Sequence, residues 1–210
     1  MDRKKISKIL QKLHKTIPNP KTELNYNSAF ELLIAVLLSA HTTDKSVNQA
    51  TAQLFKVANT PEQMLVLGEN KLRKHIKNVG LYNAKATNII KTSKILIEKH
   101  QSTIPNTREE LEQLPGVGHK TANVILNTIF HQPTVAVDTH VFRVANRTKV
   151  ALGKNVKEVE LQLLENVPKK FLNLVHILFV LHGRYVCKAR KPLCNQCVIR
   201  DLCEYEYKEL

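Results

Sequence analysis

The sequence predicts an all-α protein. Apolar residues recur at helical spacing along most of the chain, and the alternating pattern typical of strands is nearly absent. Only six of the 210 residues are glycine and eight are proline, which disfavours a fold rich in strands and turns. Hydrophobic residues make up 43% of the chain, enough to bury a core in one large or two small domains.

The first half of the chain predicts a series of helices. Residues 6–17 carry apolar side chains at helical spacing, which indicates an amphipathic helix. Ser28 can cap a helix through Ala40, whose apolar run is too short for the ~20 residues that cross a bilayer and is interpreted as a buried core helix. Thr-Pro at 60–61 predicts another helix start. Asn83 is the expected cap of a helix over 84–100.

The second half continues this pattern. Thr107 with Glu110 fits a capping box, in which a threonine is followed three residues later by a glutamate. Residues 119–130 are apolar at helical spacing, and 161–167 and 172–182 predict two more helices.

Pro133 marks a predicted domain boundary. We expect one helical domain at 22–132 and a second made of 1–21 plus 133–210, which ends in a cysteine-rich loop at 187–203. No long linker separates the two, so we expect them to pack together and to leave a groove between them.

The charge of the chain suggests a polyanionic partner. The formal net charge is +14, which favours nucleic acid first and an anionic membrane surface second, while a generic basic surface is the plain alternative. The basic N-terminus lacks the apolar core of a signal peptide, and we expect a cytoplasmic, soluble protein with no membrane association.

The stretch LPGVG at 114–118 interrupts two predicted helices. Pro115 cannot comfortably continue the first helix, and Gly116 and Gly118 can take positive φ and carry no side chain. The backbone N–H groups of Gly116, Val117 and Gly118 are then expected to face outward beside a helix N-terminus, which is a ready anion site. A plain helix–turn–helix corner is the alternative.

Lys120 falls in the first turn of the second helix, where the helix dipole is positive. A positive helix end, nearby cations and partial burial all disfavour the ammonium form. The neutral amine could attack an electrophilic carbon and form a Schiff base. The alternative is a solvated lysine that only contacts a phosphate. Lys85 begins the segment KATNII, which is similar to the segment KTANVI that begins at Lys120. Both helix starts could face one ligand, or the similarity could be coincidence.

Asp138 follows the extended segment PTVAVD and precedes a predicted helix, so it is a candidate N-cap. Capping and catalysis are compatible roles, since a capping carboxylate is held rigidly and one face of it can still point toward a groove.

All four cysteines lie close together, at positions 187, 194, 197 and 203. In a protein that looks cytosolic, this crowding favours metal over disulfides. Thiolates suit zinc and iron–sulfur clusters alike, although the spacing is not the paired Cys-X2-Cys of a zinc ribbon. Lys188, Arg190 and Lys191 lie between the first two cysteines, where a metal-fixed loop would present three cations to a DNA backbone.

These motifs together resemble a known family. LPGVGHKTANVIL (114–126), VAVDTHVFR (135–143), the loop GLYNAKA (80–86) and the cysteine tail resemble the endonuclease III branch of the helix–hairpin–helix DNA glycosylases, over essentially the whole chain. The resemblance implies that family's fold, with the helix–hairpin–helix at about 108–130 and two helical domains flanking a DNA-binding groove. It also implies a [4Fe–4S] cluster on Cys187, Cys194, Cys197 and Cys203.

The resemblance further implies a bifunctional repair enzyme. Lys120 matches the family's nucleophile, which related adenine- and thymine-mismatch glycosylases lack, and Asp138 matches the aspartate that assists it. The damaged nucleotide is flipped out, Lys120 attacks C1′, and β-elimination through the Schiff base breaks the strand 3′ to the lesion. The bases implied are oxidised or ring-saturated pyrimidines.

The same resemblance assigns DNA contacts. Leu81 would be an apolar wedge, and His41 a second plug where the family usually has glutamine. His119 stands where arginine or lysine is common, which would make phosphate binding weaker or pH-dependent. For both histidines an ordinary exposed side chain is the alternative.

The expected partner is duplex DNA with damaged bases or abasic sites, bound by a monomer that associates with the nucleoid if the source is a bacterium. A non-enzymatic DNA-binding module and a monofunctional relative are the competing hypotheses. Lys120 and Asp138 together argue against the binding module, and Lys120 argues against the monofunctional relative.

Overall fold

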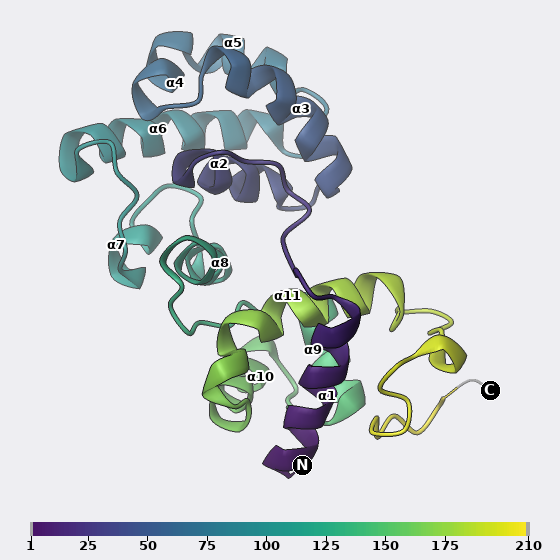
Figure 1. The fold of residues 1–210 in the computed structure, drawn as a ribbon. Helices are drawn as coiled ribbons and strands as arrows, with labels where there is room; N and C mark the ends of the chain where they lie inside the picture. Colours follow the sequence, from purple (N-terminus) through teal and green to yellow (C-terminus); the bar gives the residue numbers. More distant parts are fainter. Residues whose placement is uncertain (1, 209–210) are drawn as a thin grey trace. The chain divides into compact units, whose positions relative to one another are not determined.

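The computed structural model describes residues 2–208, and within that range it contains helices and no strand, which confirms the all-α prediction. None of the helices in this range is long and apolar enough to cross a membrane. The α-helices, drawn in Figure 1, are α1 (Arg3–Thr16), α2 (Ala29–Ser39), α3 (Asp44–Val57), α4 (Pro61–Leu67), α5 (Glu69–His75), α6 (Tyr82–His100), α7 (Arg108–Glu112), α8 (His119–Phe130), α9 (Thr139–Thr148), α10 (Val156–Asn166) and α11 (Lys169–Tyr185).

The chain forms two compact units with separate hydrophobic cores. One unit is Thr22–Phe130, and the other combines Met1–Lys21 with His131–Leu210. The unit Thr22–Phe130 is called the hairpin unit below, and the other the cysteine unit.

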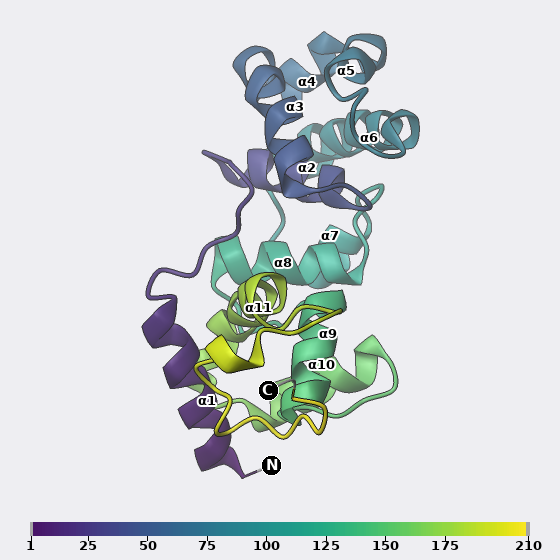
Figure 2. The ribbon, with the colours of Figure 1, turned by 90° about the vertical axis from the view of Figure 1, so that its right-hand side faces the viewer.

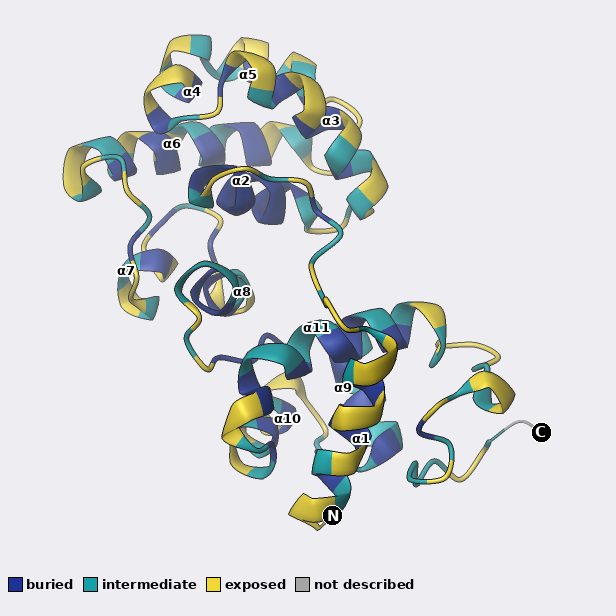
Figure 3. Ribbon diagram, viewed as in Figure 1, coloured by how far each residue is buried: buried dark blue, intermediate teal, exposed yellow. Residues whose placement is uncertain are grey.

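Helix α2 is the centre of the hairpin unit. Its residues 30–38 are all buried, as Figure 3 shows, and all of them except Glu31 are apolar. Ser28 caps it by accepting from the backbone N–H of Glu31, as predicted. Helices α3, α6 and α8 pack against α2, and α4 and α5 cover α6 (Figure 1). The core helix therefore positions both the hairpin and the N-terminus of α6.

In the cysteine unit, α11 packs against α1 and α9, and α10 packs against α9 (Figure 2). The extended segment at 134–137 is buried, with Val135 and Val137 in the core. It leads directly into α9 and so fixes where that helix begins.

Some predicted boundaries were wrong. Helix α6 begins at Tyr82, two residues before the predicted start, and its cap position is Leu81 rather than Asn83. Leu81 makes no side-chain cap hydrogen bond and takes a left-handed conformation with φ 57°. Helices α10 and α11 each begin earlier than predicted, because Asn155 caps α10 and Pro168 precedes α11. The predicted caps Thr60 and Thr107 are confirmed.

Candidate active site and metal centre

The hairpin between α7 and α8 is a tight turn built on Gly116. Its φ of +85° is one that favours glycine, and a Cβ there would lie 3.0 Å from Asn88 Nδ2 and 3.3 Å from Leu37 Cδ2. Thr92 Oγ1 donates to the carbonyl oxygen of Pro115 at 3.1 Å, which holds the turn against α6. Gly116 is thus required by the protein's own packing.

Gly118 differs from Gly116. Its φ is not positive, and a Cβ there would meet no protein atom within 4 Å. Nothing inside the described structure therefore demands glycine at 118, whereas a ligand that approaches the backbone closely would.

Val117 corrects another expectation. Its side chain is buried, and its backbone N–H donates to the carbonyl oxygen of Leu114 at 3.0 Å. This N–H is committed inside the turn, so the hairpin does not offer all three of the expected outward N–H groups.

His119 begins α8 within a polar network. Its Nδ1 lies 3.1 Å from Glu112 Oε1, and its Nε2 lies 3.3 Å from Asn123 Nδ2. Asn123 is buried and accepts from Arg108 Nη2 through Oδ1 at 2.9 Å. The imidazole is therefore oriented by both hairpin helices, although about half of its side chain is exposed.

Lys120 lies in the first turn of α8, and its side chain is exposed. The partial burial that the sequence suggested is absent. The amine is accessible to a ligand that binds at the hairpin.

Asp138 is the N-cap of α9, as predicted from its local sequence. Its Oδ1 accepts from the backbone N–H groups of His140 at 2.9 Å and Val141 at 2.8 Å, and its Oδ2 lies 3.2 Å from His140 Nδ1. The Asp138 side chain is 18% exposed, so the carboxylate is rigidly held and still reachable. Asp138 belongs to the cysteine unit and Lys120 to the hairpin unit.

His41 and Leu81 lie at the tips of two loops in the hairpin unit. Both are exposed, and both have left-handed backbones, with φ 54° and 57°. For residues other than glycine this conformation costs about 1–3 kcal/mol and persists only when the surroundings hold it. Both backbones therefore need support from the residues around them.

The four cysteines line one cavity in the cysteine unit. Cys187, Cys194, Cys197 and Cys203 carry free thiols and share the cavity wall with Arg147, His182 and Tyr205. In the part of the chain described here, no three His, Cys, Asp or Glu side chains converge closely enough for one metal ion. Zinc requires its sulfurs about 2.3 Å from a single centre, whereas a cluster of several iron and sulfide atoms takes cysteines that are further apart.

The electrostatics of this cavity fit a cationic metal group. Burial raises the pKa of the Cys197 and Cys203 thiols, and the neighbouring cysteines raise both further. Thiolates crowded in this way are unfavourable by themselves and are stabilised by a bound cation, which deprotonates coordinating thiols. The donor set therefore fits an iron–sulfur cluster.

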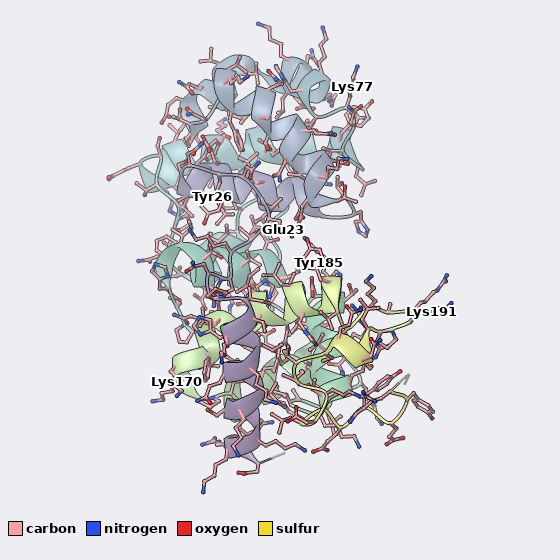
Figure 4. All side chains as sticks on the ribbon, turned by 45° about the vertical axis from the view of Figure 1, so that its right-hand side comes forward. Glu23, Tyr26, Lys77, Lys170, Tyr185 and Lys191 are labelled. Carbon is pink, nitrogen blue, oxygen red and sulfur yellow. The ribbon has the colours of Figure 1, made fainter. Side chains whose placement is uncertain are left out.

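Two arginines of α9 anchor the loop 187–203. Arg143 donates to the carbonyl oxygens of Cys187 and Gly183 at 2.9 and 2.8 Å. Arg147 donates to those of Lys188 and Ala189 at 2.7 and 3.0 Å, and its guanidinium lies 4.6 Å from the ring centre of Tyr205. These contacts leave Lys188, Arg190 and Lys191 exposed, and Figure 4 shows Lys191 projecting from the loop.

Comparisons with known proteins agree with this geometry. Residues 34–169 match the HhH-GPD superfamily of base excision DNA repair proteins, and residues 187–203 match the iron–sulfur binding domain of endonuclease III. Endonuclease III of Escherichia coli (strain K12) is 58% identical over 208 residues, which cover 99% of each chain. Endonuclease III of Haemophilus influenzae shows the same identity and coverage.

A solved structure is similarly close. A trapped endonuclease III–DNA covalent intermediate, with estranged adenine, superposes with a TM-score of 0.89 at 40% identity, over 97% of this chain and 96% of that one. The chain accordingly carries a [4Fe–4S] cluster, and all four of its cysteines lie within the matched iron–sulfur segment 187–203. The chain belongs to the endonuclease III family of helix–hairpin–helix base excision DNA repair enzymes.

Proposed function

We propose that Lys120 and Asp138 carry out the reaction of this enzyme, which is a DNA N-glycosylase and an abasic-site lyase. The observation that carries the proposal is the hairpin itself: an exposed lysine stands two residues after Gly118, whose missing side chain no protein contact explains. A DNA backbone that approaches at Gly118 would bring a sugar near Lys120. The trapped covalent state of a 40% identical endonuclease III supports a nucleophile of this kind.

In the glycosylase step, the Asp138 carboxylate takes a proton from the Lys120 ammonium, and the free amine attacks C1′ of the flipped nucleotide. The bond from C1′ to the base breaks, and its electron pair leaves with the base. Because Asp138 is held by two backbone N–H groups, it also offers fixed negative charge to the positive charge that develops on the sugar.

In the lyase step, the nitrogen lone pair of Lys120 forms a C=N bond as the C1′–O4′ bond breaks, and O4′ takes up a proton. Lys120 thereby becomes the nitrogen of a Schiff base. The protonated C=N bond acidifies C2′, loss of a C2′ proton forms a C=C bond, and the C3′–O bond breaks. The strand is thereby cut 3′ to the lesion, and hydrolysis of the Schiff base frees Lys120.

DNA binding is assigned to three surfaces. Gly116, Gly118 and His119 form the hairpin surface for a phosphate at the start of α8, while Val117 anchors the turn from inside. Lys188, Arg190 and Lys191 form a second cationic surface, which the [4Fe–4S] cluster supports by fixing the loop that carries them. Leu81 and His41 form the third, where they fill the gap left by the flipped nucleotide.

The proposed substrates are duplex DNA with oxidised or ring-saturated pyrimidines and duplex DNA with abasic sites, and the proposed active form is a monomer. The cysteines Cys187, Cys194, Cys197 and Cys203 are the proposed cluster ligands.

Borohydride trapping tests the nucleophile. Duplex DNA with one abasic site is incubated with the wild type, with Lys120→Ala, and with Lys94→Ala as a matched control on the exposed face of α6. We expect a covalent protein–DNA band from the wild type and from Lys94→Ala, and none from Lys120→Ala, with DNA affinity retained. A band that persists in Lys120→Ala would overturn the assignment of Lys120 as the nucleophile. The absence of a band from the wild type would contradict a lyase reaction through a Schiff base.

A further inference from the structure

Lys85 is a buried lysine with a full set of acceptors. It is 8% exposed, and its Nζ donates to the carbonyl oxygen of Leu38 at 2.8 Å, to that of Ala40, and to Thr42 Oγ1 at 3.3 Å. An ammonium has three N–H donors, and the three acceptors match them. Because two acceptors are carbonyl groups at the C-terminal end of α2, the charge also lies at the negative end of that helix dipole.

A second link joins the same two segments. The backbone N–H of Gly80 donates to Thr42 Oγ1 at 3.1 Å. A Cβ on Gly80 would lie 3.0 Å from the carbonyl oxygen of His41, tighter than ordinary van der Waals contact. Thr42 Oγ1 therefore bonds to both Lys85 and Gly80, and glycine at 80 lets the two loops touch.

These contacts surround the two strained loop tips. The contacts among Lys85, Thr42, Gly80 and the carbonyl groups of Leu38 and Ala40 are called the junction below. His41 precedes Thr42, and Leu81 follows Gly80, so each left-handed residue is adjacent to a residue of the junction. Leu81 is 67% exposed and His41 is exposed, while Lys85 beneath them is buried. The tips are presented to solvent, and the junction below holds their backbones.

We propose that Lys85 and Thr42 are positioning residues that join the His41 loop and the Leu81 loop into one rigid two-pronged wedge, which enters the duplex as a unit. This inference rests on the proposed roles of Leu81 and His41 as gap fillers. Their preset left-handed backbones mean that the wedge is ordered before DNA arrives, so little ordering is required when the nucleotide leaves the stack.

The junction also separates the functions of the two similar lysines. Lys120 is exposed and available to the sugar, while all three donors of Lys85 are engaged in holding loops. Lys85 is thus excluded as a second nucleophile by its contacts and by its burial.

The test removes the shared oxygen. Thr42→Val deletes the Oγ1 that accepts from Gly80 and Lys85, Thr42→Ser restores it, and Thr87→Val is the matched control, because Thr87 lies on α6 and its hydroxyl donates to Glu69 and Asn83 instead. Fluorescence of 2-aminopurine opposite an oxidised pyrimidine, followed by stopped flow, reports insertion of the wedge. We expect Thr42→Val to slow insertion about tenfold, as for the loss of a hydrogen bond from a charged donor, and Thr42→Ser and Thr87→Val to resemble the wild type.

Gly80→Ala is an independent second variant. It leaves every donor and acceptor in place and pushes the loops apart through the added Cβ. Thermal melting confirms that each variant is folded, and we expect Gly80→Ala to slow insertion as Thr42→Val does.

A double-mutant cycle separates positioning from general stability. If the loops act as a unit, Thr42→Val adds little to the slow insertion of Leu81→Ala, whereas independent effects would add. Additive effects would contradict the proposal that the two loops act as one wedge. Insertion at the wild-type rate in both Thr42→Val and Gly80→Ala would contradict it as well. Borohydride trapping at a preformed abasic site is run in parallel. Wild-type trapping by Thr42→Val confines any defect to insertion, and failure of the wild type itself to trap would count against the proposed function instead.

Discussion

Asp138 Oδ1 lies 2.8 Å from the backbone nitrogen of Val141, so the carboxylate proposed to assist Lys120 also starts helix α9. The two roles make different demands on the side chain. Capping needs an oxygen acceptor, which an amide also provides, while proton transfer needs the carboxylate.

Asp138→Asn and Asp138→Ala separate these roles. Asparagine caps as well as aspartate, so we expect Asp138→Asn to melt like the wild type and to lose about 100-fold or more in base excision. Asp138→Ala should lose activity and also about 1 kcal/mol of stability. Single-turnover excision and thermal melting measure the two effects. An active Asp138→Asn enzyme would show that the charge is not required.

His119→Lys tests the hairpin as a phosphate site. The Glu112–His119 pair is largely exposed and therefore weak, so a lysine at 119 would remain available to a phosphate. We expect tighter DNA binding and a salt dependence that steepens by about one unit of log Kd against log salt concentration. Lys94→Ala serves again as the control. An unchanged slope would indicate that position 119 does not face the backbone.

Iron and sulfide analysis tests the metal centre. We expect about four iron and four sulfide per chain, with visible absorption, and Cys194→Ser should lose both together with stability of the cysteine unit. A colourless protein that contains zinc would contradict the cluster.

The cationic loop can be tested with the cluster intact. Replacing Lys188, Arg190 and Lys191 by alanine removes three exposed charges and no ligand. We expect unchanged iron content, weaker DNA binding, and a salt slope shallower by up to about three. A variant that binds DNA like the wild type would place the loop away from the phosphates.

The burial of Lys85 predicts that the stability of the folded protein depends on pH. Burial lowers its pKa from the ordinary 10.5, so the unfolded chain holds this proton to higher pH than the folded one. The cost of burying the charge is fully present below the folded pKa and declines as pH rises toward 10.5. We expect the melting temperature of Lys85→Met, relative to the wild type, to fall as pH rises toward 10.5. A constant difference would mean that Lys85 does not titrate in this range.

Much of the fold could be predicted because its signals are local. The caps Ser28, Thr60 and Thr107 act on backbone groups within three residues, and the apolar run 30–38 required burial wherever it was placed. The capping role of Asp138 was equally local. Such features depend only on residues that are close to one another in the sequence.

The Lys85 junction could not be predicted, because its partners are distant in sequence. Lys85 and Lys120 begin nearly identical segments, yet one is buried and the other exposed. The difference arises from the end of α2, more than 40 residues before Lys85, which supplies the carbonyl oxygens. The left-handed start of α6 was missed for the same reason, since Leu81 has no cap chemistry and is held by the loop beside it.

Helix α9 finally imposes a constraint on how this chain can change over evolutionary time. Asp138 fixes its first turn, and Arg143 and Arg147 fasten its later turns to the cysteine loop, all within ten helical residues or about 15 Å. An inserted or deleted residue in α9 would rotate one end about 100° relative to the other and would misplace either the carboxylate or the arginines. A change in the length of α9 therefore disrupts one of its two ends, whereas a substitution at a position that makes none of these contacts leaves both ends in place.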